Sequence, residues 1–384
     1  MAERLQATLA PDGIDKLIRA LTGRGYQVLG PTVRDGAIVY DKIEGADDLP
    51  RGWTDDQGPG RYRLKERPDG AFFGYGNGPQ TWKKYLHPPE LRLFAADRQD
   101  GLFHILDSTS PPGPPMAFVG VRACELAAVG IQDRALLEGK FRDSGYGSRR
   151  DRAFIVAVQC TQAAATCFCA SMRTGPEGTN PEVRAKADLT LTEVVNADSH
   201  WFLAEAGSKR GREVLAGLDG QPATEEAIQL ARSAVESAAA QQVRHMETGG
   251  IHDLLYQNFE HPRWDEIAAR CLSCGNCTMV CPTCFCTNVE DVSDVTGNHA
   301  ERWRRWDSCF TMSFSYIHGG SVRTSAKARF RQWMTHKLAS WSDQFGTTGC
   351  VGCGRCIAWC PVGIDLTEEA QALRGVVNDG NTNS

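Results

Sequence analysis

The sequence predicts an α+β fold, in which an N-terminal mixed α/β domain precedes an all-helical domain rich in cysteine. Helical periodicity alternates with short extended apolar runs over residues 1–222, which indicates the mixed domain. A long Ala- and Glu-rich stretch over 223–250 ends at a Gly pair and predicts a connecting helix. Strand patterns are scarce over 251–384, which makes this the helical domain.

The N-terminal domain opens with a helix and strands. The stretch "GIDKLIRALTGRG" (13–25) has an amphipathic helical period and ends at a Gly. The extended runs "YQVLG" (26–30) and "GAIVYDKI" (36–43) follow it. Further along, "LRLFAADRQDGLFHILDS" (91–108) predicts two strands around an Asp-Gly turn.

A short internal repeat predicts a β-α-β unit. The segments "AFVGVRAC" (117–124) and "AFIVAVQC" (153–160) align without a gap, and each has a buried-strand pattern with a cysteine at its end. The residues between them include "ELAAVGIQDRALLEG" (125–139), which has helical periodicity. Parallel strands end at the same edge of a sheet, so we expect Cys124 and Cys160 to lie near each other.

Two copies of the pattern C-x2-C-x2-C-x3-C, each followed by Pro, dominate the helical domain. This pattern is typical of proteins with two [4Fe-4S] clusters, in which the fourth cysteine of each run binds the other cluster. Structural zinc uses two cysteine pairs per ion and leaves the third and fourth thiols unexplained, so it is the weaker interpretation. The expected ligands are Cys271, Cys274, Cys277 and Cys360 for one cluster, and Cys350, Cys353, Cys356 and Cys281 for the other.

Seven of the fifteen cysteines lie outside these motifs. The β-α-β unit and the loop "CTQAAATCFC" would bring four of them together, and two interpretations stay open for these: ligands of a third [4Fe-4S] cluster, or small buried side chains. The four are Cys124, Cys160, Cys167 and Cys169. The other three, Cys284, Cys286 and Cys309, would need a partner other than cysteine to complete a metal site.

Composition and missing motifs exclude several function classes. A net charge of −5 gives no case for a nucleic-acid partner, and no Walker A motif or H-E-x-x-H occurs. The sequence "GYGNGP" (74–79) fails the dinucleotide pattern at its last position, so we expect neither nucleotide nor flavin in this chain and no catalytic site of its own. Without an apolar leader or an 18-residue apolar run, the chain is expected to be cytoplasmic, where free thiols are favoured over disulfides.

The motifs together resemble a known family. The segments "GVRACELAAVGIQDRAL", "CLSCGNCTMVCPTCFCTNVEDVSDVTG", "ERWRRWDSCF" and "GCVGCGRCIAWCPVGIDLTEE" are similar to the β subunits of cytoplasmic, NAD(P)-linked nickel-iron hydrogenases of the heterotetrameric sulfhydrogenase type. The electron-transfer subunit of anaerobic sulfite reductases is similar in the same segments. The 68 residues between Cys281 and Cys350 also resemble the helical two-cluster domains of fumarate and heterodisulfide reductases more than a short ferredoxin.

The resemblance implies an electron-transfer role within a multi-subunit oxidoreductase. The partners would be a small iron-sulfur subunit, a nickel-iron large subunit, and a flavin subunit that binds NAD(P)H. The residues alone leave a role in a sulfite reductase open, as well as an iron-sulfur protein with a structural or sensing role. A regulator would be expected to show a helix-turn-helix or a basic face, and neither is evident.

Overall fold

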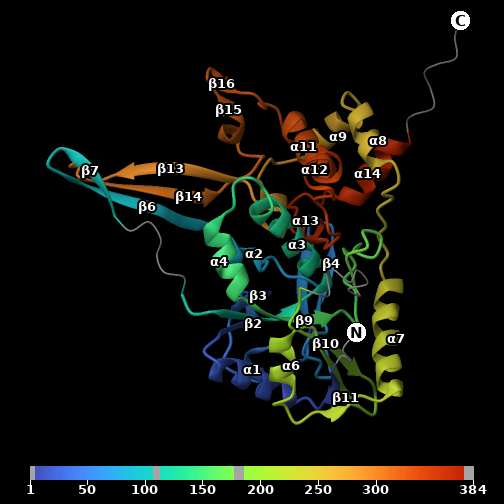
Figure 1. Cartoon of the computed structure of the whole chain (residues 1–384). Helices are drawn as coiled ribbons and strands as arrows, with labels where there is room; N and C mark the ends of the chain where they lie inside the picture. Colours follow the sequence, from blue (N-terminus) through green and yellow to red (C-terminus); the bar gives the residue numbers. More distant parts are fainter. Residues whose placement is uncertain (1–4, 107–112, 177–185, 376–384) are drawn as a thin grey trace, which may run out of the picture.

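The computed structural model describes residues 5–106, 113–176 and 186–375. Its largest element is a mixed sheet of eight strands, seen edge-on in the lower half of Figure 1. In spatial order the strands are β12 (Gln221–Pro222), β1 (Gln6–Leu9), β11 (His200–Ala206), β10 (Leu189–Val195), β9 (Phe154–Gln159), β8 (Met116–Val121), β2 (Gln27–Arg34) and β3 (Ala37–Lys42). The α+β class predicted from the sequence is therefore confirmed.

The predicted β-α-β unit forms the centre of this sheet. Strands β8 and β9 are parallel, and α3 (Ala123–Leu137) and α4 (Ser144–Arg152) connect them. A bulge between Val119 and Val121 shifts the register, so Val121 pairs with Ala157 at the 36-residue offset of the sequence repeat. One detail differs from the expectation: Cys124 does not end a strand but lies in the first turn of α3.

Helices cover the two faces of the sheet with separate cores. Helices α1 (Gly13–Gly23) and α6 (Lys209–Leu215) bury an apolar core on one face, in which Val119 and Val156 take part. Helix α3 covers the opposite face, where Phe118 and Ile155 point. The alternation follows from the two-residue period of a strand. The second core also contains Val351 and Cys353, so the cysteine-rich part of the chain packs directly on the α3 side.

A second, four-stranded sheet extends from the body as an arm on the left of Figure 1. It contains β13 (Thr287–Ser293), β14 (His299–Trp306), β6 (Glu90–Gln99) and β7 (Leu102–Leu106), in this order. The predicted hairpin is confirmed, since Asp100 and Gly101 both take positive φ in its turn. The expectation of an all-helical second domain is corrected, because β13 and β14 lie within 251–384 and β14 pairs with β6 from the N-terminal half.

Helices make up most of the remaining C-terminal part. They are α8 (Ile251–Gln257), α9 (Arg263–Arg270), α10 (Asn276–Met279), α11 (Ala326–Thr335), α12 (Trp341–Phe345), α13 (Arg355–Ala358) and α14 (Leu366–Arg374), with a π-helical turn at His336–Ser340 between α11 and α12. The predicted connecting helix is shorter than expected: α7 spans Glu225–Ala240, and the chain reaches α8 without further helix.

Smaller elements complete the structure. They are the helical turns Ala46–Asp48 and Met312–Ser315, helix α2 (Lys83–Leu86), and the hairpins β4 (Trp53–Gly58) with β5 (Arg61–Glu66) and β15 (Tyr316–Ile317) with β16 (Gly320–Ser321). Among the described helices, none combines the length and apolar character that crossing a bilayer requires.

His87, at the foot of the arm, gives a prediction about pH. Both ring nitrogens are buried without a hydrogen-bond partner among the described residues, and burial with the nearby Arg304 charge lowers the pKa of His87 to about 4. The unfolded chain takes up this proton below its ordinary pKa of 6.5, so stability is lost as the pH falls from 6.5 towards 4. We expect the free energy of unfolding to fall by about 2 kcal/mol between pH 7 and pH 5 on this account.

Anaerobic urea unfolding at both pH values measures this effect. His87→Leu keeps the volume and removes the titrating group, so it should show a smaller loss over the same interval. An equal loss in both proteins would assign the pH dependence to other groups.

Candidate metal centres

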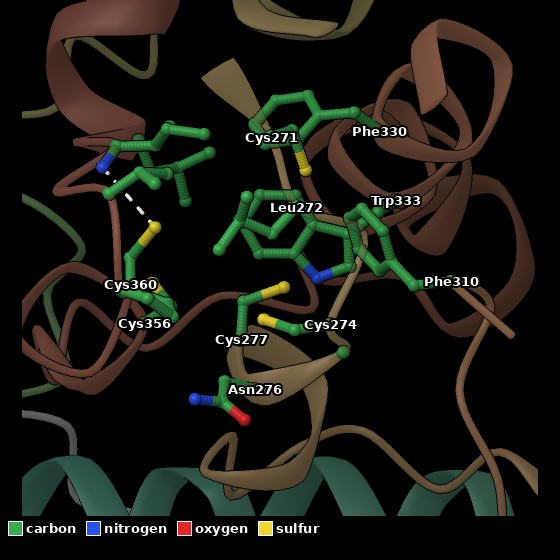
Figure 2. A pocket seen from close by; sticks show the side chains of 15 residues that line it. Cys271, Leu272, Cys274, Asn276, Cys277, Phe310, Phe330, Trp333, Cys356 and Cys360 are labelled. Carbon is green, nitrogen blue, oxygen red and sulfur yellow. Dashed lines mark hydrogen bonds between the residues drawn. The ribbon is translucent and has the colours of Figure 1, made fainter. Parts of the chain in front are cut away.

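The first cysteine motif lines a cavity together with cysteines of the second. The cavity wall includes Cys271, Cys274 and Cys277 as well as Cys356 and Cys360, and the aromatic residues Phe310, Phe330 and Trp333 close it. Figure 2 shows the sulfur atoms of Cys271, Cys274, Cys277 and Cys360 around a common space. The structure therefore brings Cys360 to the first motif, although it lies in the second motif of the sequence.

Both motifs use the same backbone turn. Ser273 and Gly352, each one residue before the second cysteine, take φ of 53° and 63°, and Gly275 and Gly354, each one residue after it, take 76° and 74°. The backbone N–H of Ser273 donates to Cys271 Sγ at 3.4 Å, and that of Gly352 donates to Cys350 Sγ at 3.5 Å. These left-handed positions wrap each chain segment around its thiols. The shared geometry gives the sequence repeat a structural meaning.

Cys281 lies with the second motif. Burial, and then the neighbouring charges of Cys350, Cys353 and Cys281, raise the pKa of the Cys356 thiol. Burial raises the pKa of the Cys350 thiol to about 12, and the charges of Cys353 and Cys281 act in the same direction. The four thiols are therefore close neighbours. The structure brings the last cysteine of each motif to the first three cysteines of the other.

The N-terminal quartet (Cys124, Cys160, Cys167 and Cys169) is also brought together. Burial, and then the charge of Cys169, raise the pKa of the Cys124 thiol. Burial and the charges of Cys169 and Cys160 do the same for Cys167, and burial with Cys160 raises the pKa of Cys169 to about 12. Each of these thiols therefore has a neighbour within the quartet, and Cys169 lies close to Cys124 as well as to Cys160.

The quartet is in direct contact with the second motif. Phe168 N–H donates to the Gly352 carbonyl at 2.9 Å, and Thr174 Oγ1 donates to the Val351 carbonyl at 2.6 Å. A Cβ at Gly352 would come within 2.7 Å of the Cys169 backbone, so only glycine allows this approach. Cys353 is close enough to contribute to the raised pKa of both Cys124 and Cys169.

The thiol trio (Cys284, Cys286 and Cys309) lines a separate cavity of about 480 Å³. The π-helical turn contributes His336 and Lys337 to its wall, and Trp333, which also borders the first cavity, lies between the two. Mid-helix π turns are frequently found at functional sites. The sequence singled out these three cysteines but gave no sign of the residues around them.

Lys337 links the trio to the second motif. Its Nζ lies 3.2 Å from Cys281 Sγ and 3.5 Å from Cys284 Sγ, and it donates to the Gly349 carbonyl at 3.1 Å. Burial by itself would lower the pKa of Lys337, but the thiolate charges of Cys281 and Cys284 outweigh it and hold that pKa well above its usual value. A hydrogen bond from Cys284, with Lys337 acting in the same direction, lowers the pKa of Cys281.

A buried ion pair lies between the quartet and the second motif. Arg355 Nη2 donates to Glu125 Oε1 at 2.7 Å, and both side chains are at least 98 % buried. Arg355 Nε also donates to the Gly78 carbonyl at 2.9 Å. Glu125 accepts from Tyr40 and Trp82 in turn. Residues from four segments of the chain are therefore fixed around one charge pair beside Cys124 and Cys353.

The donor set fits iron-sulfur clusters. All fifteen cysteines are free thiols. Within residues 5–106, 113–176 and 186–375, no three Cys, His, Asp or Glu side chains lie close enough to bind a single metal ion. The thiolates of an iron-sulfur cluster bind different iron atoms, so they can lie further apart. Trp333 Nε1 and Arg355 Nη1 are buried donors without an acceptor among the described residues. Cluster sulfur atoms accept such hydrogen bonds.

Comparison with known proteins agrees with this donor set. Residues 270–364 match the family described as the 4Fe-4S dicluster domain. The chain is 32 % identical over 258 residues to sulfhydrogenase 2 subunit beta of Pyrococcus furiosus, an alignment that covers 66 % of this chain and 73 % of that protein. The chain belongs to the family of hydrogenase β-type iron-sulfur subunits. No solved structure matches it.

Several residues of these sites could not be found from the sequence. Lys337 and Arg355 lie in helical segments where a basic residue normally faces solvent, and no spacing rule predicts that they are buried beside thiols. The only sequence signal for Arg355 is its place within the second cysteine motif. Glu125 follows Cys124 directly, yet its partner lies 230 residues away. Tertiary structure alone joins them.

Proposed function

We propose that this chain transfers electrons between a flavin subunit that binds NAD(P)H and a nickel-iron hydrogenase module. The proposal rests on the repeated cysteine turn. The fourth cysteine of each motif, Cys281 or Cys360, lies with the first three cysteines of the other motif. Similarity to a sulfhydrogenase β subunit favours the hydrogenase over a sulfite reductase. Bound iron-sulfur clusters supply one-electron transfer, and the residues of the chain bind them, exclude water and set their electrostatic surroundings. Catalysis is expected in the partner subunits.

The proposed ligands follow the contacts of the thiols. One [4Fe-4S] cluster would be held by Cys271, Cys274, Cys277 and Cys360, and a second by Cys350, Cys353, Cys356 and Cys281. A third would be held by the quartet, which touches the second motif through the Gly352 backbone. In this arrangement the sites form a continuous series from the N-terminal sheet into the helical part.

We further propose that the chain has two functional parts, residues 1–222 and residues 251–384, joined by the connection at 223–250. Electrons would enter the relay through one part and leave it through the other. A partner could dock on the arm, where β7 exposes Leu102, Phe103 and Ile105 by 68 %, 57 % and 71 %. Neighbouring exposed apolar side chains of this kind often mark protein–protein contacts. Another subunit of the same complex is the proposed occupant, because the relative carries a subunit name.

Iron analysis tests the cofactor content. We expect anaerobically purified chain to carry at least about eight iron and eight sulfide, because each complete motif with its exchanged thiol provides four ligands. Inductively coupled plasma measurement gives iron and zinc together, and an acid-labile sulfide assay gives the sulfide. About four iron per chain, or zinc in place of iron, would contradict the two-cluster assignment.

Reconstitution of the complex tests the relay role. Without this chain, the flavin subunit should still reduce an artificial dye with NAD(P)H, and the nickel-iron module should still evolve hydrogen from a reduced dye. Hydrogen evolution from NAD(P)H should require addition of the chain. If the two partners couple equally well without it, the relay function is wrong, and a structural role would fit instead.

A further inference from the structure

We propose that the thiol trio and His336 hold an additional iron-sulfur cluster, separate from the two motifs and from the quartet. The site lies in the cavity of about 480 Å³ between β13, the 309 region and the π-helical turn. Cavities that bind small ligands start at roughly 300 Å³, whereas a packing defect holds a few waters at most. The cavity therefore has room for a prosthetic group.

His336 provides the fourth ligand that three cysteines lack. Its Nε2 lies 3.2 Å from Gln344 Oε1, and both residues line the cavity. In the tautomer that donates from Nε2 to this amide oxygen, Nδ1 keeps its lone pair and would bind iron. Metal-binding histidines commonly have such a second partner, which fixes the ring and its tautomer.

Charge around the trio fits bound thiolates. Lys83 and Lys337 are 95 % and 97 % buried, and no carboxylate pairs with either among the described residues. Lys337 Nζ lies 3.5 Å from Cys284 Sγ, and Lys83 Nζ lies 2.9 Å from the Cys284 carbonyl oxygen. Two buried ammonium groups need negative charge nearby. Cys281 of the second motif, 3.2 Å from Lys337 Nζ, supplies part of it, and thiolates of the trio on iron would supply the rest.

A buried donor gives an independent sign of a ligand. Trp341 lines the same cavity, is 2 % exposed, and its indole Nε1 has no hydrogen-bond acceptor among the described residues. A buried N–H without an acceptor is costly, and the sulfide of a cluster can accept it. A single zinc ion offers no such acceptor. Nor do any three candidate ligands in the described ranges stand close enough for one ion.

The place of the site suggests what it connects. Cys309 lies near Cys277 of the first motif, since its charge contributes to the raised pKa of that thiol after burial. Cys284 lies beside Cys281, which groups with the second motif. The trio itself is half-buried, whereas three of the four quartet cysteines, Cys124, Cys167 and Cys169, are buried. The additional cluster would thus lie between both motifs and the surface, where a partner could exchange electrons.

The experiment compares full-length variants purified anaerobically. Cys286→Ser/Cys309→Ser should contain two to four fewer iron per chain than the parent, depending on whether the cluster has two or four iron atoms. Pulsed electron paramagnetic resonance of the reduced parent should show coupling to a histidine nitrogen. His336→Cys should keep the iron content and lose that coupling, which guards against simple misfolding of the serine variant.

The control separates this inference from the proposed relay. Cys350→Ser should lose iron from the second motif while the nitrogen-coupled signal persists. Unchanged iron in the Cys286→Ser/Cys309→Ser variant, zinc in place of the lost iron, or nitrogen coupling that survives in His336→Cys would each overturn the additional cluster. None of these results would affect the eight iron expected at the two motifs.

Discussion

Replacement of Arg355 by Met is expected to lower the free energy of unfolding by about 3–5 kcal/mol. Arg355 is 1 % exposed and its guanidinium donates to Glu125 and to the Gly78 carbonyl, so its loss leaves a buried carboxylate without its cation. Methionine fills similar space and makes none of these bonds. Glu125 would keep only the neutral donors Tyr40 and Trp82.

Anaerobic urea unfolding followed by tryptophan fluorescence measures the loss. Glu125→Gln combined with Arg355→Met removes both charges, so the double variant should be more stable than Arg355→Met alone. Arg19→Gln is the matched control, because it breaks the exposed Arg19–Asp15 pair and should cost less than about 1 kcal/mol. A loss this small in Arg355→Met would mean that the pair contributes little.

Much of the N-terminal half could be predicted because its signals are local. The helix at 13–25, the strands that follow it and the Asp-Gly hairpin each carry their own period and turn residues. The β-α-β unit was visible as a repeat, and parallel pairing of β8 with β9 confirmed it. The bulge at Gly120, which takes φ of 94°, could not be seen in the repeat.

The second, four-stranded sheet could not be predicted as a whole from the sequence. Strands β13 and β14 carry many charged residues; β13 is largely exposed and β14 is half-buried along its whole length, so both lack the apolar alternation that marks a strand. β14 pairs with β6, a partner about 200 residues earlier in the chain. Pairing at this distance has no local signature, and the all-helical expectation failed for that reason.

The residues of the candidate metal sites also divide into those that the sequence could predict and those that it could not. Spacing singled out the cysteines of the two motifs, and the repeat predicted that Cys124 and Cys160 lie near one sheet edge. The assignment of ligands to individual clusters stays a prediction. The charged residues among the thiols were beyond sequence reasoning, since Lys337 reaches Cys281 across 56 positions and Arg355 reaches Glu125 across 230. A helical period reports which side of a helix is apolar, not which cation is buried.

Replacement of Cys360 by Ser is expected to disrupt the cluster at Cys271, Cys274 and Cys277, with a loss of up to about four iron per chain. Cys360 shares the first cavity with these three cysteines, and its Sγ accepts the Ile364 N–H at 3.3 Å. A serine oxygen is a poorer ligand for iron than a thiolate. The cluster of the motif in which Cys360 lies should be retained.

The reciprocal variant Cys281→Ser is the matched control. Cys281 groups with Cys350, Cys353 and Cys356, so its loss should damage the other cluster. Iron analysis and electron paramagnetic resonance of the two reduced variants should therefore show complementary losses, each lacking the signal that the other keeps. If Cys360→Ser instead loses the signal that Cys350→Ser also loses, each motif binds its own cluster. The exchange of thiols seen in the cavity would then have no role in ligation, and the repeated turn would form two independent sites.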